Sequence, residues 1–136
     1  MNTRKHIILS ALSAVIFATL ACSSFATGPT TSNFYMASDK AGANKTTTFT
    51  TSQDFFVFFD VSGIPDGTKF QAQWFALDVP SQDSTKPFQT TDYTYANGVT
   101  TIYFQLTNSG GWPTGHYRVD LYMSGTKIGE QLFSVQ

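Results

Sequence analysis

Few residues of this sequence have side chains that could transfer a proton. His116 is followed four positions later by Asp120, and a carboxylate beside a histidine can orient the imidazole as a general base. In an extended strand, residues four apart are separated by roughly 13 Å, at about 3.3 Å per residue. Such a pair needs hydrogen-bond contact of about 3 Å, so the spacing rules it out and predicts a solvated strand face. The sequence therefore predicts no catalytic residues and a protein that is not an enzyme.

Metal ligands are equally sparse. Structural zinc requires about four cysteine or histidine ligands, and beyond the N-terminal segment only His116 remains. Asp78, Asp83 and Asp92 lie in or near one polar loop, but they lack the alternating acidic pattern with a glycine turn that holds calcium. We therefore expect no metal and no cofactor.

The aromatic residues point to binding. Phe55 to Phe59 are interrupted only by Val57, so alternation along a strand places Phe56 and Phe58 on one face and Phe55 and Phe59 on the other. If one pair enters the core, the other lies outside, and Phe56, Phe58 and Tyr103 form a candidate interaction patch. The alternative is that the N-terminal segment or a long loop covers that face.

A second group of aromatic residues suggests carbohydrate binding. Trp112, followed by proline, either stacks on a sugar or caps the open end of the core, and capping is favoured because tryptophan buries a large area. A carbohydrate-binding module would use Trp112, Tyr122, Phe75 and Tyr95 as stacking platforms. Coplanar exposed rings would favour sugar, whereas a contiguous phenylalanine patch would favour another protein or self-association.

The segments that position these residues are short strands separated by turns, with no helical periodicity. Asn97-Gly98 is typical of a type I′ hairpin turn, because both residues tolerate positive φ. An earlier start of the second strand, within 47–51, stays open. Seven strands are predicted, at about 33–38, 53–62, 69–77, 91–95, 99–106, 116–123 and 127–135.

Alternation of apolar and polar residues indicates two packed antiparallel sheets. In 69–77, Trp74 lies on the apolar face and is the expected core anchor. In the last strand, Ile128 and Phe133 share a face only if a residue is inserted, and Gly129 marks the expected bulge.

The N-terminus has the features of an export signal. Arg4 and Lys5 precede an uncharged apolar stretch, 7–21, which is too short to span a bilayer comfortably. Cleavage after Ala26 is favoured, and a lipoprotein signal ending at residue 21, with lipid on Cys22, is the alternative. We therefore expect a signal peptide at 1–26, a flexible lead at 27–32 and one domain at 33–136, in the periplasm, on the cell surface or secreted from a bacterium.

Composition limits the partners. From Thr27 onward six basic residues face nine acidic ones, a net charge of −3, and no basic stripe suggests nucleic acid. Cys22 is the only cysteine, so the domain has no disulfide. Membrane contact is expected only through a lipid on Cys22.

Two segments and one residue carry a family resemblance. Gly115-His116-Tyr117-Arg118-Val119 and Phe133-Ser134-Val135, with Trp74, resemble the closing strands and core tryptophan of bacterial extracytoplasmic immunoglobulin-like domains. Without a cysteine pair, the chain is more similar to the fibronectin-III-like members. The resemblance implies an all-β, seven-stranded immunoglobulin-like sandwich, and it implies no particular ligand.

These observations favour a non-enzymatic exported binding module whose partner is another protein or a second copy. A carbohydrate-binding module is the main alternative, and an immunoglobulin-like protease inhibitor or an enzyme is less favoured.

Overall fold

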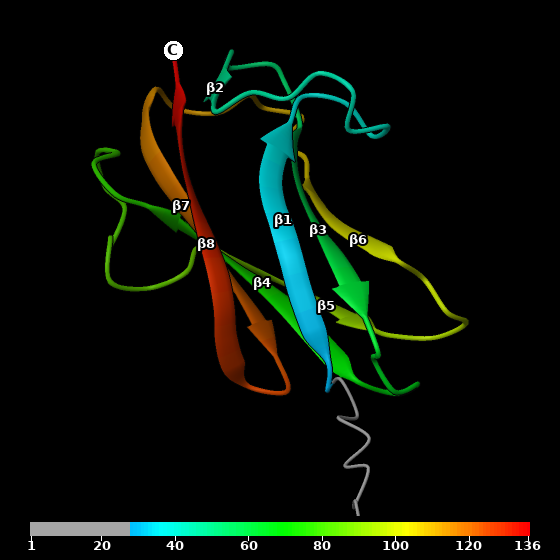
Figure 1. Ribbon diagram of the computed structural model, residues 1–136. Coiled ribbons are helices and arrows are strands. Elements are labelled where there is room, and N and C mark those ends of the chain that lie inside the picture. The colour runs from blue at the N-terminus through cyan, green and yellow to red at the C-terminus, as the bar shows by residue number, and fades with distance from the viewer. Residues whose placement is uncertain (1–27) are drawn as a thin grey trace, which may run out of the picture.

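The computed structural model describes residues 28–136, which fold into strands joined by turns and loops (Figure 1). No helix in this range is long and apolar enough to cross a membrane. The predicted signal peptide and Cys22 lie outside the described residues. The eight strands are β1 (Thr30–Ala37), β2 (Thr48–Phe49), β3 (Phe55–Ser62), β4 (Lys69–Ala76), β5 (Gln89–Thr94), β6 (Thr101–Leu106), β7 (Gly115–Met123) and β8 (Thr126–Val135).

The strands form two sheets that face each other (Figure 1). One sheet has the order β1-β3-β6, and the other has the order β2-β8-β7-β4-β5. All pairs are antiparallel except β2 with β8. The predicted sandwich is confirmed, but the predicted count of seven strands is wrong. The additional strand, β2, lies between β1 and β3 in the sequence but belongs to the other sheet. It pairs with the end of β8, where Phe49 lies opposite Val135.

The predicted flexible lead at 27–32 is partly wrong. β1 begins at Thr30, which lies opposite Ser62 at the end of β3. The register shifts between Ser32 and Tyr35, and Asn33 there has a φ of 52°. Its side chain donates a hydrogen bond to the Asp60 carboxylate at 2.7 Å. A bulge thus extends pairing into a segment whose composition suggested no strand.

The fourth predicted strand exists, but its pairing differs from the hairpin that Asn97-Gly98 suggested. Asn97 and Gly98 have φ values of 63° and 65°, as expected for a type I′ turn. β5, however, pairs with β4, and β6 pairs with β3. The turn therefore connects strands of different sheets, because local turn chemistry does not determine which neighbour a strand adopts.

The core between the sheets follows the predicted alternation. Trp74 is fully buried, as are Phe55 and Phe59, and Ile102 and Phe104 of β6 point to the same interior. Thr101, Tyr103 and Gln105 alternate with them on the solvent side. The predicted place of Trp74 on the inner face of β4 is confirmed.

The predicted bulge in the last strand is also confirmed. Leu121 pairs with Gly129, whereas the next residue, Tyr122, pairs with Lys127, so Ile128 is the inserted residue. A Cβ added to Gly129 would lie 2.8 Å from the Phe34 ring. Glycine is therefore required by this close approach of β1, and the bulge restores the inward direction of Phe133.

Candidate functional site

The outer face of β3 is covered rather than exposed. Phe56 and Phe58 are each 4% exposed and form a second small core with Ala37, so their predicted exposure is wrong. The Tyr35 ring stacks on Phe58 with centroids 5.0 Å apart. Only Tyr103 of the predicted patch is exposed, at 39%. The phenylalanine pair is therefore not available to a partner.

The cover is the loop at 38–45. Both oxygens of the Asp39 carboxylate accept backbone hydrogen bonds, from the N–H groups of Ala43 and Asn44. The hydrogen bond from Asn44 is the largest cause of the lowered pKa of Asp39. Gly42 has a φ of 69°, and a Cβ there would meet the Phe58 ring at 3.2 Å. The loop therefore covers the outer face of β3, where Phe56 and Phe58 lie. Cover by a loop is the alternative that the sequence left open.

Trp112 caps the end of the sandwich, as favoured from the sequence. Its indole N–H donates to the Gln53 carbonyl at 3.0 Å, and its ring stacks on Phe55 with centroids 4.6 Å apart. Trp112 and Tyr117 border a depression of about 460 Å³, but they are only 8% and 2% exposed. No broad ring face of either residue is open for sugar stacking.

The remaining predicted stacking residues do not come together. Phe75 is 6% exposed and Tyr95 is 5% exposed, and the Tyr95 hydroxyl donates to the Val99 carbonyl. Their predicted role as exposed platforms is therefore wrong. Tyr122 is half-buried on the outer face of β7. The described residues present no row of exposed rings.

The outer face of the five-stranded sheet carries the most exposed large apolar side chain of residues 28–136, Leu132 at 58%. Leu132 on β8 lies opposite Arg118 on β7, which lies opposite Phe75 on β4. The Arg118 guanidinium carbon is 4.4 Å from the centroid of the Phe75 ring. Because residues directly opposite on one face have Cβ atoms only about 5 Å apart, these three form a continuous strip, here named the Leu132 row.

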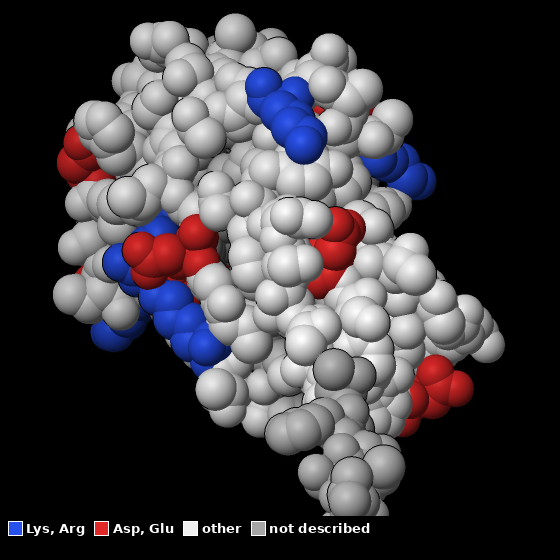
Figure 2. Space-filling view, viewed as in Figure 1, with Lys and Arg blue, Asp and Glu red and all other residues white. Residues whose placement is uncertain are grey.

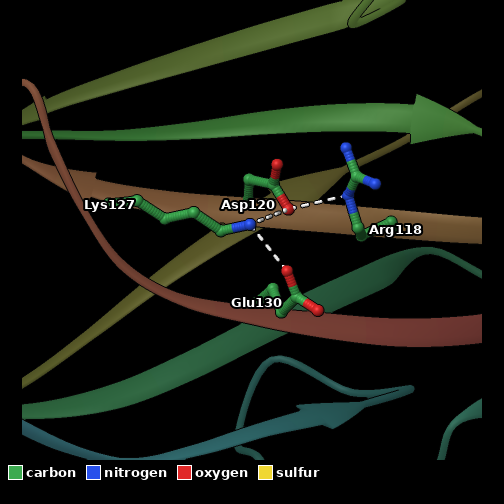
Figure 3. A network of polar contacts seen from close by, with 4 residues as sticks. All are labelled: Arg118, Asp120, Lys127 and Glu130. Atoms are coloured by element: carbon green, nitrogen blue, oxygen red, sulfur yellow. Dashed lines mark hydrogen bonds and ion pairs between the residues drawn. The ribbon is translucent and has the colours of Figure 1, made fainter. Parts of the chain in front are cut away.

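Arg118 also belongs to a charge network with Asp120, Lys127 and Glu130 (Figure 3). Asp120 on β7 is buried, although its place on the outer face predicted solvation. Its Oδ1 lies 2.8 Å from Nε of Arg118 and 3.3 Å from Nζ of Lys127, and Lys127 also contacts Glu130 at 2.6 Å. The hydrogen bond between Lys127 and Glu130 is the main cause of the raised pKa of Lys127 and the lowered pKa of Glu130.

The two cations and two anions of this network balance. Figure 2 shows acidic and basic side chains adjoining one another beside β7 and β8, without a broad patch of one sign on the face shown. The network holds Arg118 between a carboxylate and the Phe75 ring, since a guanidinium can pair at its edge and stack through its face. Arg118 is thereby fixed beside Leu132.

His116 has a carboxylate partner that the sequence did not reveal. Its Nδ1 lies 2.6 Å from Oδ2 of Asp78, and its backbone N–H donates to Oδ1 of the same carboxylate. The pair forms because the start of β7 meets the end of β4, where the Leu77 N–H donates to the His116 carbonyl. Both side chains are largely exposed, and Ser134, opposite His116, makes no hydrogen bond to it in the described part of the chain. The arrangement is a hydrogen-bonded pair on the surface without a positioned nucleophile.

Asp78→Asn is expected to remove part of the acid sensitivity of folding. The hydrogen bonds from His116, that of the backbone N–H first, lower the pKa of Asp78 below 3.8. A lowered pKa stabilises the fold above the unfolded-state pKa, and this stabilisation is lost as pH falls through the folded-state value. In thermal melts from pH 7 to pH 2, the melting temperature of the wild type should therefore exceed that of the variant at neutral pH, and the two melting temperatures should converge in acid. A gap that stays constant with pH would contradict the assignment.

The three aspartates considered for calcium have separate partners. Asp92 accepts a hydrogen bond from Gln71 on β4, and Asp83 accepts one from Thr85 in its own loop. Asp78 binds His116 as described. Among residues 28–136, no group of three or more acidic, histidine or cysteine residues is placed to hold a metal ion.

The two facing sheets, the buried tryptophan on β4 and the β7–β8 hairpin define an immunoglobulin-like sandwich. An immunoglobulin-like protein from Pseudomonas aeruginosa has a similar structure, with a TM-score of 0.55 and 15% identity. The match covers 77% of this chain and 93% of that one. No family model and no curated protein sequence matches the chain.

Two larger proteins contain a similar domain. The alkylpurine DNA glycosylase AlkC of Pseudomonas fluorescens matches with a TM-score of 0.50 and 9% identity, over 79% of this chain and 30% of that one. A β-glucosidase of Listeria innocua matches with a TM-score of 0.50 and 15% identity, over 79% of this chain and 16% of that one. At these identities the likeness shows the fold alone.

Proposed function

We propose that this protein is a non-enzymatic binding module of the bacterial cell envelope or exterior, and that it binds another protein through the Leu132 row. The observation that carries the proposal is the exposure of Leu132, 58%, in continuous contact range with Arg118 and Phe75. Other large apolar side chains of the described range are buried or half-buried, apart from Tyr103. Export remains a prediction from the N-terminal sequence.

The row has the composition of a small protein-binding surface. Binding sites often combine an apolar centre with arginine and a charged rim. Leu132 supplies the centre, and Lys127 and Glu130 supply the rim. Arg118 is held in place by Asp120 before any partner arrives, so little side-chain entropy is lost on binding. The partner that fits is a protein presenting an apolar side chain to Leu132.

The alternatives receive less support. Carbohydrate binding relied on exposed rings, and Trp112, Phe75 and Tyr95 are buried. An enzyme would need a nucleophile or an acid–base pair in a sheltered cleft, and the pair of His116 and Asp78 lies on the open surface. A binding surface needs neither.

Photo-crosslinking tests the proposal at residue level. A photoreactive amino acid at position 132, in the native host, should yield a discrete adduct with an envelope protein that mass spectrometry identifies. The same probe at Thr90, an exposed outer position on β5, is the matched control and should yield none. With the purified partner, Leu132→Asp should weaken binding at least about tenfold, since it replaces a desolvated apolar contact with a charge.

Two results would oppose the proposal. Adducts at position 90 but not at position 132 would place the binding surface elsewhere. Unchanged affinity of a folded Leu132→Asp variant for the identified partner would remove Leu132 from the interface.

A further inference from the structure

The four edge strands differ in how they are protected. β1 carries a bulge at Asn33, and β2 has only two residues. β5 carries Asp92. β6 has the sequence Thr-Ile-Tyr-Phe-Gln-Leu, with no charge, proline or bulge, and it is the outermost strand of its sheet (Figure 1). Bulges, charges and short length are the devices that prevent edge-to-edge pairing, and β6 itself has none of them; the nearest cation, Nζ of Lys40 in the loop at 38–45, lies 5.9 Å from the centroid of the Tyr103 ring.

The unpaired backbone groups of β6 can be assigned from its register. The Val61 N–H donates to the Thr100 carbonyl, which fixes the hydrogen-bonded positions of the β3–β6 ladder. Because these positions alternate along an antiparallel pair, Ile102 and Phe104 bond to β3. Thr101, Tyr103 and Gln105 therefore direct their N–H and C=O groups to the free edge. Within residues 28–136 no strand pairs with this edge, and no turn or loop backbone hydrogen bond reaches it.

One self-pairing register satisfies all of these groups. In an antiparallel pair, residues directly opposite point to the same face. A two-fold axis through Tyr103 places Tyr103 opposite its copy, and Thr101 opposite Gln105 of the second copy. About six backbone hydrogen bonds form, two for each hydrogen-bonded pair. The inner residues also match, because Ile102 lies opposite Phe104 of the second copy.

The other long, unbulged edge opposes self-pairing. The Tyr95 N–H donates to the Thr68 carbonyl, so by the same alternation Thr90, Asp92 and Thr94 direct their backbone groups outward from β5. The equivalent two-fold register places Asp92 opposite its own copy. Two carboxylates directly opposite on one face repel. The charge pattern therefore selects β6 as the self-compatible edge.

From this we infer that β6 is a homodimer interface, through which two copies join their three-stranded sheets into one six-stranded sheet. This contact is separate from the Leu132 row, which lies on the other sheet. Ile102 and Phe104 are only 3% exposed in the single copy, so dimerisation buries little more of them. The free energy of dimerisation therefore comes mainly from backbone hydrogen bonds and the contact between the two Tyr103 side chains. Interfaces with so little additional burial are weak, and we expect a Kd on the order of 100 μM.

Amide hydrogen exchange followed by NMR tests the inference on the protein lacking its N-terminal signal. As the protein concentration is raised, sedimentation velocity should show dimer forming. Over the same range, the amides of Thr101, Tyr103 and Gln105 should become protected from hydrogen exchange. The outward amides of Thr90, Asp92 and Thr94 on β5 are the internal control and should exchange at the same rate throughout.

Two variants sharpen the result. Tyr103→Lys places two lysines opposite each other and should weaken dimerisation at least about tenfold with the fold retained, because Tyr103 is partly exposed. Thr90→Lys adds the same charge to the other sheet and should leave dimerisation unchanged. Any of three results would overturn the inference: a protein that stays monomeric at all concentrations, amide protection that appears only in β5, or a Tyr103→Lys variant that dimerises as strongly as the wild type.

Discussion

Replacement of Trp74 by alanine is expected to lower the free energy of unfolding by about 3–5 kcal/mol. Trp74 is fully buried on the inner face of β4, and the Phe133 ring lies edge-on to it with centroids 6.1 Å apart. Alanine would remove the indole and leave a cavity in the middle of the core. For a domain with about 5–15 kcal/mol of total stability, this is a large part of the whole. Urea unfolding followed by circular dichroism measures the change.

Trp74→Phe is the matched control. The indole N–H of Trp74 has no hydrogen-bond partner among residues 28–136, so phenylalanine loses volume but no polar contact found there. Its cost should be about half or less of that of alanine, because part of the ring is kept. A loss below about 1 kcal/mol for Trp74→Ala would show that the side chain does not anchor the core.

Much of the fold was predictable because it depends on patterns that are local in the chain. Alternation alone identified Trp74 as an inward residue, and the parity conflict between Ile128 and Phe133 located the bulge at Gly129. Strand pairing was less predictable. Asn97-Gly98 has the dihedral angles expected of a hairpin turn, but the partner of β5 is chosen by contacts with β4.

The candidate site was harder to predict, because its parts are distant in sequence. His116 and Asp78 are 38 positions apart, and only the junction of β4 with β7 brings them together. Asp120 alternates with inward residues, as a solvated side chain would. It is buried because Arg118 and Lys127 lie over it. No pattern within a single strand reports such cross-strand partners.

Leu132 illustrates a different limit. It follows Gln131 and precedes Phe133 in β8, where the bulge had already interrupted the simple alternation. Once the register with β7 is known, its place opposite Arg118 and outside the core is unambiguous. A signal for it did exist in the sequence, since the bulge that turns Phe133 inward must turn Leu132 outward.

Phe58→Ala is expected to destabilise the domain by about 3–5 kcal/mol, although Phe58 lies outside the main core. Its ring stacks on Tyr35 and lies 5.5 Å from the Tyr103 centroid, and the loop at 38–45 covers it at Gly42. Removing the ring takes away the surface on which that loop packs. The loop should then open more often, so trypsin should cleave faster after Lys40 and Lys45. Urea unfolding and limited proteolysis measure the two effects.

Leu132→Ala provides the contrast for Phe58→Ala. It also truncates a large apolar side chain, but Leu132 is 58% exposed, so the free energy of unfolding should change by no more than about 0.5 kcal/mol. Trypsin cleavage at the loop should be unaffected, because Leu132 lies on the other sheet. If Phe58→Ala proved as mild as Leu132→Ala, the loop would not be packed over β3 in solution. The outer face of β3 would then be open to a partner. If Phe58→Ala instead lost the expected stability without faster trypsin cleavage, the loop would be held by Asp39 and not by the Phe58 ring.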